Sequence, residues 1–87
     1  MDKKERKIKQ LFYDIATYAN KNWKCCADMS ERFQAVVDWY DAFRIEPNGH
    51  DMQTLLNNLK EDVDNGSSDA QKFYEELIGM INESEEK

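Results

Sequence analysis

Few residues in this chain have types that could do chemistry: a single histidine, two cysteines and an acidic segment. His50 has no second histidine to pair with, and Cys25 and Cys26 are adjacent rather than spaced as Cys-x-x-Cys. A zinc site therefore lacks ligands at the usual spacing, and no recognisable motif surrounds a Cys-His nucleophile pair. We expect His50 to be a solvated turn residue, and we expect a protein that is not an enzyme and holds no metal or cofactor.

The acidic segment 61–69, EDVDNGSSD, has the composition of a calcium-binding loop. If Gly66 takes the invariant glycine position of such a loop, Val63 falls on the third ligand position and Lys72 on the final carboxylate position. Neither side chain can bind calcium there. The segment is better explained as an acidic helix end that a turn joins to the start of the next helix, with a weak cation site as the alternative.

Charge is segregated along the chain. Residues 1–44 carry nine Lys or Arg against seven Asp or Glu, a net charge of +2, whereas residues 45–87 carry three against eleven, a net charge of -8. A field of one sign attracts oppositely charged molecules and repels nucleic acids and anionic membranes. We therefore expect a basic protein partner, no direct contact with nucleic acid and no contact with a membrane.

Length and composition favour a small protein of the cytoplasm. The chain has 87 residues and no stretch near the ~20 apolar residues that a membrane span needs. Its N-terminus, MDKKERKIKQ, runs into an amphipathic segment rather than the apolar core of a secretory signal. A disulfide between adjacent cysteines would remove almost no chain entropy, so reduced thiols in a cytoplasmic compartment are expected.

Apolar residues recur at helical spacing in four segments and predict an all-α fold, a compact four-helix single domain over residues 1–87. The helices are expected at about 3–21, 28–45, 51–63 and 68–82, with a frayed tail at 83–87. In the second helix the expected buried stripe is Phe33, Val36, Val37, Tyr40 and Phe43.

Three local signals set the expected ends of these helices. Asp28 with Glu31 forms a capping-box-like start for the second helix, and Ser68 with Gln71 forms another for the fourth. The segment 47–49, Pro-Asn-Gly, is the strongest turn signal, because proline restricts one dihedral angle and Asn-Gly readily adopts positive ones.

The candidate partner-binding residues are the acidic side chains of the second half together with exposed aromatic anchors. The core of so small a domain does not need every aromatic residue, and Trp and Tyr often anchor protein interfaces. Acidic clusters also serve only to keep a protein soluble, which is the alternative. The candidates are Asp51, Glu61, Asp62, Asp64, Asp69, Glu75, Glu76, Trp23 and Tyr74.

The chain resembles the colicin and pyocin nuclease immunity proteins, small acidic four-helix proteins that bind and inhibit the nuclease domain of a bacteriocin. The similar features are Phe33-x-x-Val36-Val37-x-x-Tyr40-x-x-Phe43, then Pro47-Asn48-Gly49-x-Asp51-Met52, then an Asp-rich link into a last helix with a capping serine. Asp51 is the family binding residue that the resemblance implies. The tyrosine pair and proline of that family's third helix are replaced here by Gln53-Thr54-Leu55-Leu56-Asn57.

These observations together predict a small acidic inhibitor or regulator that occupies the basic surface of a nucleic-acid-handling enzyme. An immunity protein is one version, and a phage or mobile-element protein that disarms a host nuclease or a CRISPR complex, an anti-CRISPR, is another. The alternative is a structural module that self-associates, as a homodimer, and has no inhibitory role.

Overall fold

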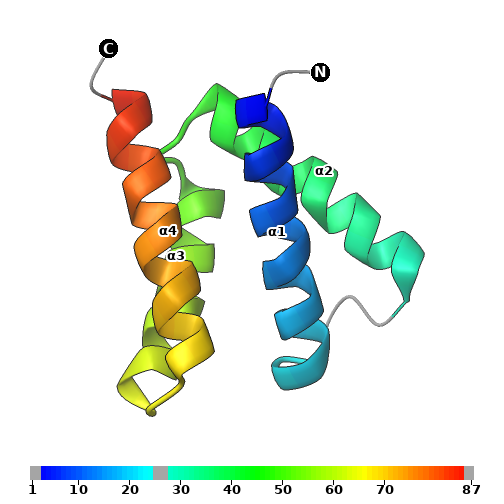
Figure 1. The fold of residues 1–87 in the computed structure, drawn as a ribbon, viewed down its shortest axis with the longest axis vertical. Helices are drawn as coiled ribbons and strands as arrows, with labels where there is room; N and C mark the ends of the chain where they lie inside the picture. The colour runs from blue at the N-terminus through cyan, green and yellow to red at the C-terminus, as the bar shows by residue number, and fades with distance from the viewer. Residues whose placement is uncertain (1–2, 25–27, 86–87) are drawn as a thin grey trace. The chain divides into compact units, whose positions relative to one another are not determined.

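The computed structural model describes residues 3–24 and 28–85, and the regular structure in these ranges is entirely α-helical (Figure 1). The four helices are α1 (Lys3–Asn22), α2 (Met29–Ile45), α3 (His50–Asp64) and α4 (Ser68–Glu85). The predicted all-α class with four helices is confirmed. The helix ends agree with the predicted ones to within one residue, apart from the end of α4.

α4 continues beyond its predicted end and reaches Glu85. Ile81 is only 3% exposed, so a buried turn precedes residues 82–85. The N–H groups of these residues can donate to carbonyls of that turn, which continues the helix. The predicted frayed tail is therefore wrong for residues 83–85, while residues 86 and 87 lie outside the described ranges.

The chain divides into two compact units, residues 1–41 and 42–87, and the boundary falls inside α2. The expected single domain stays a prediction. The first unit carries eight Lys or Arg against seven Asp or Glu, a net charge of +1, and the second carries four against eleven, a net charge of -7. The segregation of charge seen in the sequence therefore follows the structural division.

In the first unit, α1 contacts α2 through large aromatic side chains. Phe12, which is fully buried, packs against Trp39 with ring centroids 6.1 Å apart. The ammonium group of Lys9 lies 4.9 Å from the centre of the Tyr40 ring, and it also forms a 3.1 Å ion pair with Glu5. The buried side of α1 consists of Ile8, Leu11, Phe12, Ile15, Ala16 and Ala19. Helical spacing predicts this side with Tyr18 in place of Ala16, but Tyr18 is half-buried.

The predicted buried stripe of α2 is only partly correct. Val36 is 8% exposed and Phe43 is buried as predicted, but Phe33 is 55% exposed and Val37 is 50% exposed. Val37 points about 100° away from Val36 around the helix, and it falls outside the buried side. The structure buries the side that holds Val36 and leaves the side that holds Phe33 and Val37 open.

The segment that joins α2 to α3 turns as predicted, but for a different reason. Gly49 has a φ of -74°, so its backbone does not use the positive angles that Asn-Gly favours. Its N–H donates to the carbonyl oxygen of Glu46 at 2.8 Å, and a Cβ at this position would lie 3.0 Å from that oxygen. A side chain at position 49 would crowd the backbone of Glu46.

In the second unit, α3 and α4 pack against each other as an antiparallel pair (Figure 1). Each of the two helices places its large aliphatic side chains on one side. The buried residues of the pair are Met52, Leu55, Leu56, Leu59, Ala70, Leu77 and Ile81.

Candidate interaction surfaces

A tight turn between α3 and α4 brings the end of one helix next to the start of the other. Gly66 has a φ of 96°, in the left-handed region that side chains disfavour. Its N–H donates to the carbonyl oxygen of Val63 at 2.9 Å, and the N–H of Ser67 donates to that of Asp62 at 3.0 Å. These bonds satisfy carbonyls at the end of α3 and fix the direction in which the chain enters α4.

The residue that caps α4 is Ser67 rather than Ser68, so the predicted capping pair is wrong by one position. The side-chain oxygen of Ser67 accepts a hydrogen bond from the backbone N–H of Ala70 at 3.2 Å. Gly66 completes the reversal one residue earlier than the sequence pattern indicates, which places Ser67 at the N-cap. The start of α2 agrees with its prediction, because the Asp28 carboxylate accepts from the N–H of Glu31 at 2.8 Å.

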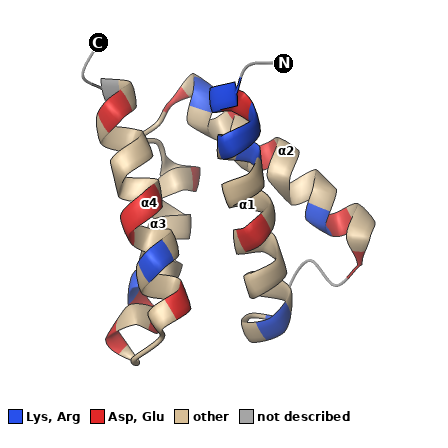
Figure 2. Cartoon of the chain, viewed as in Figure 1, with Lys and Arg blue, Asp and Glu red and all other residues tan. Residues whose placement is uncertain are grey.

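Four of the predicted acidic residues lie on the two sides of this turn, and we call them the turn cluster. They occupy the last turn of α3 and the first turn of α4, and Figure 2 shows acidic segments on both sides of the reversal. All are exposed except Asp62, which is half-buried. The members of the turn cluster are Glu61, Asp62, Asp64 and Asp69.

The other predicted acidic residues lie farther along the two helices. At a rise of about 1.5 Å per residue, Asp51 is about 20 Å from the end of α3. Glu75 and Glu76 lie on α4 about 10 Å beyond Asp69 on the same measure. All three side chains are exposed. The structure therefore groups the turn cluster and leaves the remaining acids spread along the helix pair.

The two predicted aromatic anchors belong to different units. Trp23 follows α1 in the first unit, where its ring meets that of Tyr18 edge to face at 5.6 Å. Tyr74 lies on α4 in the same unit as the turn cluster. Both side chains are half-buried. Of the two predicted anchors, only Tyr74 therefore shares a structural unit with the acidic residues.

The acidic residues at the end of α3 lie where a carboxylate is unfavourable. The C-terminus of a helix carries the negative end of the helix dipole, so Lys or Arg in the last turn stabilises the helix and Asp or Glu destabilises it. α1 and α2 have Lys21 and Arg44 in their last turns. The last turns of α3 and α4 contain no basic residue, and that of α3 includes Glu61 and Asp64. Local helix stability therefore does not explain this placement.

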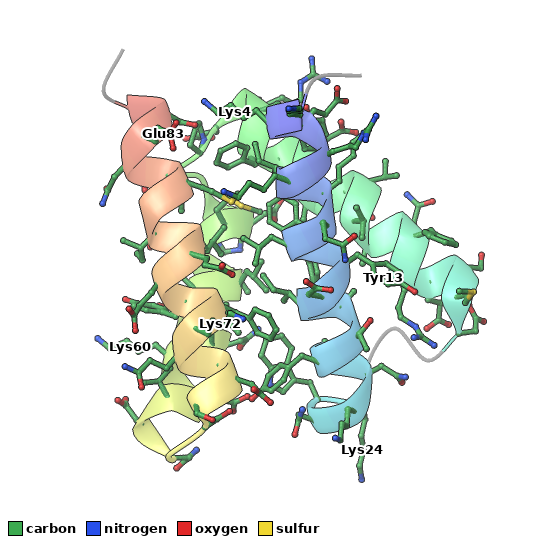
Figure 3. The ribbon with its side chains drawn as sticks, viewed as in Figure 1. Lys4, Tyr13, Lys24, Lys60, Lys72 and Glu83 are labelled. Carbon is green, nitrogen blue, oxygen red and sulfur yellow. The ribbon has the colours of Figure 1, made fainter. Side chains whose placement is uncertain are left out.

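A second surface consists of exposed apolar residues on α2, two of which, Phe33 and Val37, were predicted to be buried. Met29, Phe33 and Val37 follow one another at intervals of four residues, so they lie along one side of the helix, and Met29 is 55% exposed. The ring of Phe33 stacks on that of Tyr13 at 5.7 Å, and Figure 3 shows Tyr13 on the side of α1 nearest α2. We call Met29, Phe33 and Val37 the α2 face.

One sequence signal could have indicated the α2 face. A helix that buries one side normally has apolar residues on that side alone, but those of α2 extend around much of its circumference. The full set includes three adjacent apolar residues, so some must be exposed wherever the core lies. The set is Met29, Phe33, Ala35, Val36, Val37, Trp39, Tyr40, Ala42, Phe43 and Ile45.

The residues first considered for chemistry do not gather in the described part of the chain. His50 is the exposed first residue of α3, while Cys25 and Cys26 lie outside the described ranges. Among the described residues, no group of three or more His, Cys, Asp or Glu side chains is placed to hold a metal ion. None of the helices within those ranges has the length and apolar character needed to cross a bilayer.

No protein-family model matches this chain, and no curated protein or solved structure matches it either. The resemblance to nuclease immunity proteins stays a prediction.

Proposed function

We propose that the acidic surface of α3 and α4 binds a basic surface on an enzyme that handles nucleic acids, and that this binding inhibits or regulates the enzyme. Carboxylates on rigid helices present negative charge at fixed positions, as the phosphates of a nucleic acid do. A basic surface that attracts phosphate attracts them for the same reason. An immunity protein and an anti-CRISPR protein are two versions of this function.

The observation that carries the proposal is the turn cluster at the end of α3. Its unit has a net charge of -7, and two of its exposed carboxylates lie at the negative end of the helix dipole. Acidic residues that serve only solubility can lie anywhere on the surface. At helix N-termini they would also stabilise the helices. A binding role explains why Glu61 and Asp64 lie where they lower the stability of α3.

The test uses Glu61→Gln with Asp64→Asn, which removes two charges without changing side-chain size. Each substitution is expected to raise the free energy of unfolding by about 0.3–1 kcal/mol at low salt, because it removes a carboxylate from the helix C-terminus. The same pair of substitutions is expected to weaken partner binding and to reduce its salt dependence. A variant that is more stable but binds less well cannot have lost binding through unfolding.

The matched control is Asp14→Asn with Asp38→Asn in the first unit, which changes the net charge from -6 to -4 as well. Each of these aspartates accepts a hydrogen bond from a glutamine of its own helix, Gln10 or Gln34, and asparagine can accept the same bond. This control is expected to bind like the original protein. Equal weakening by both pairs would show that net charge alone matters, and the turn cluster would lose its role.

The partner is sought by capturing proteins from a lysate of the source organism with the tagged chain and eluting them in steps of rising salt. The expected result is a nuclease or a nucleic-acid-binding complex that salt releases and that the Glu61→Gln, Asp64→Asn variant fails to capture. The purified enzyme should then be inhibited by the original chain and by the Asp14→Asn, Asp38→Asn control. Capture that is indifferent to salt, or an enzyme whose activity does not change, would contradict the proposal.

The α2 face favours a second candidate, a structural module that self-associates and has no inhibitory role. An exposed apolar row is typical of a surface that another protein covers. This candidate predicts that the Glu61→Gln, Asp64→Asn pair leaves every interaction of the chain unchanged.

A further inference from the structure

We propose that a basic segment of the enzyme partner lies directly against α4 at Gly79 and places Arg or Lys side chains between the carboxylates around this residue. The contact rests on the proposed function, because it belongs to the acidic surface of α3 and α4 through which the enzyme would be bound. It adds a second contact point to the turn cluster, since Gly79 is about 15 Å from Asp69 along the axis of α4.

The helix itself does not require a glycine at position 79. α4 spans Ser68–Glu85, so Gly79 lies more than one turn from either end, and Gly66 rather than Gly79 has a positive φ. Apart from the neighbouring backbone of α4, no described atom lies within 4 Å of the position of a Cβ. Alanine would fit there and would favour the helix, because glycine has more conformational freedom to lose on folding. Neither backbone conformation nor internal packing therefore accounts for Gly79.

Gly79 lies on the exposed side of α4, as a residue without a side chain among residues that have long ones. On a helix surface, the nearest neighbours of a residue are three and four positions away in each direction. All four of these neighbours are exposed: Glu75, Glu76, Asn82 and Glu83. Glycine commonly occurs where another backbone or a ligand approaches the chain closely. An approaching segment can therefore reach the backbone of α4 at this residue and meet polar side chains on both sides of it.

The charge around Gly79 selects a basic occupant. Three of its four neighbours are glutamates, and the nearest basic residue on α4, Lys72, is about two turns away. Figure 2 shows acidic segments of α4 with uncharged ribbon between them. An apolar segment would remove water from these carboxylates and an acidic one would repel them, whereas Arg or Lys can donate hydrogen bonds to them. Arginine fits best, because its guanidinium group can bind a carboxylate through two parallel hydrogen bonds.

An oligo-arginine peptide is the probe for such a segment. Nuclear magnetic resonance of the full chain at low salt should show that the peptide shifts the amide signals of residues 75–83 as well as those of the turn cluster. Gly79→Gln is expected to abolish the shifts at residues 75–83 and to keep those at the turn cluster. Glu61→Gln with Asp64→Asn should have the opposite effect, which separates the two contact points.

The purified enzyme partner tests the Gly79 variants, with Ser30→Gln as the control. Ser30 is exposed on α2 in the first unit, so this substitution adds a glutamine side chain to a helix away from the acidic surface. Gly79→Gln is expected to raise the dissociation constant about fivefold or more, and Gly79→Ala less, while Ser30→Gln changes it little. Both Gly79 variants should melt at a higher temperature, because alanine and glutamine favour a helix more than glycine does. Weaker binding by a more stable chain cannot result from unfolding.

Two results would overturn the contact at Gly79. One is an oligo-arginine titration in which the shifts at residues 75–83 are absent or survive Gly79→Gln, and the other is equal weakening of enzyme binding by Gly79→Gln and Ser30→Gln. An enzyme that the Gly79→Gln variant inhibits as well as the original chain does, but that the Glu61→Gln, Asp64→Asn variant does not inhibit, would contradict this inference alone. A chain that inhibits no such enzyme would contradict the proposed function as well.

Discussion

Glycine has opposite effects on stability at two positions of the second unit, Gly66 and Gly79. Gly66 has a φ of 96°, which an L-residue adopts only with strain, although no atom lies within 4 Å of the position of a Cβ. Gly79 lies inside α4, also with open space around it, where glycine only adds flexibility to the unfolded chain. Backbone conformation, and not space, distinguishes the two residues.

Gly66→Ala is expected to lower the free energy of unfolding by about 1–2 kcal/mol, because alanine would have to adopt the left-handed conformation. Gly79→Ala should raise it by about 0.5–1 kcal/mol, because alanine favours the helix. Urea denaturation followed by circular dichroism measures both. A neutral Gly66→Ala would mean that the turn can be made without a positive φ at this position.

At the scale of the elements, helix starts depend on which side chain reaches the free N–H groups. Asp28 was predicted correctly, because it comes directly before a helical pattern and three residues before Glu31. Two serines are adjacent where α4 begins, and the sequence pattern favours Ser68 as the cap, whereas the turn at Gly66 places Ser67 there. The choice depends on where the preceding turn ends.

Ser67→Ala is expected to lower the free energy of unfolding by about 1 kcal/mol, because the N–H of Ala70 loses its acceptor. Ser68→Ala, the neighbouring control, should change it by no more than about 0.5 kcal/mol. Thermal denaturation of the two variants makes the comparison. Equal losses would contradict the assignment of Ser67 as the cap.

In the whole molecule, the acidic charge is concentrated in one of the two units, residues 42–87. Repulsion among the carboxylates of residues 42–87 opposes folding of that unit, and salt screens it over about 10 Å at 0.1 M. The first unit, with a net charge of +1, has little repulsion of this kind.

Raising NaCl from about 20 to about 200 mM should therefore raise the melting temperature of the chain, because screening weakens this repulsion. The rise should be smaller for Glu61→Gln with Asp64→Asn than for Asp14→Asn with Asp38→Asn. Differential scanning calorimetry of the three proteins provides the measurement. The same salt response in both variants would place the repulsion away from the turn cluster.

The sequence by itself determined the four helices, most of their ends, the buried sides of α1 and α3 and the segregation of charge. These features depend on residue type and local spacing, which a linear pattern contains. The position of the acidic residues at the surface follows from residue type as well, because charged side chains are rarely buried.

Only the tertiary structure decided which side of α2 is buried, which serine caps α4 and which acidic residues form a cluster. The first depends on packing between helices, and the other two depend on the backbone conformation of the turn at Gly66. α2 has apolar residues around much of its circumference, so packing selected the buried side and left Phe33 and Val37 exposed. The turn at Gly66 likewise brought Asp69 to the end of α3, where it joins Glu61 and Asp64.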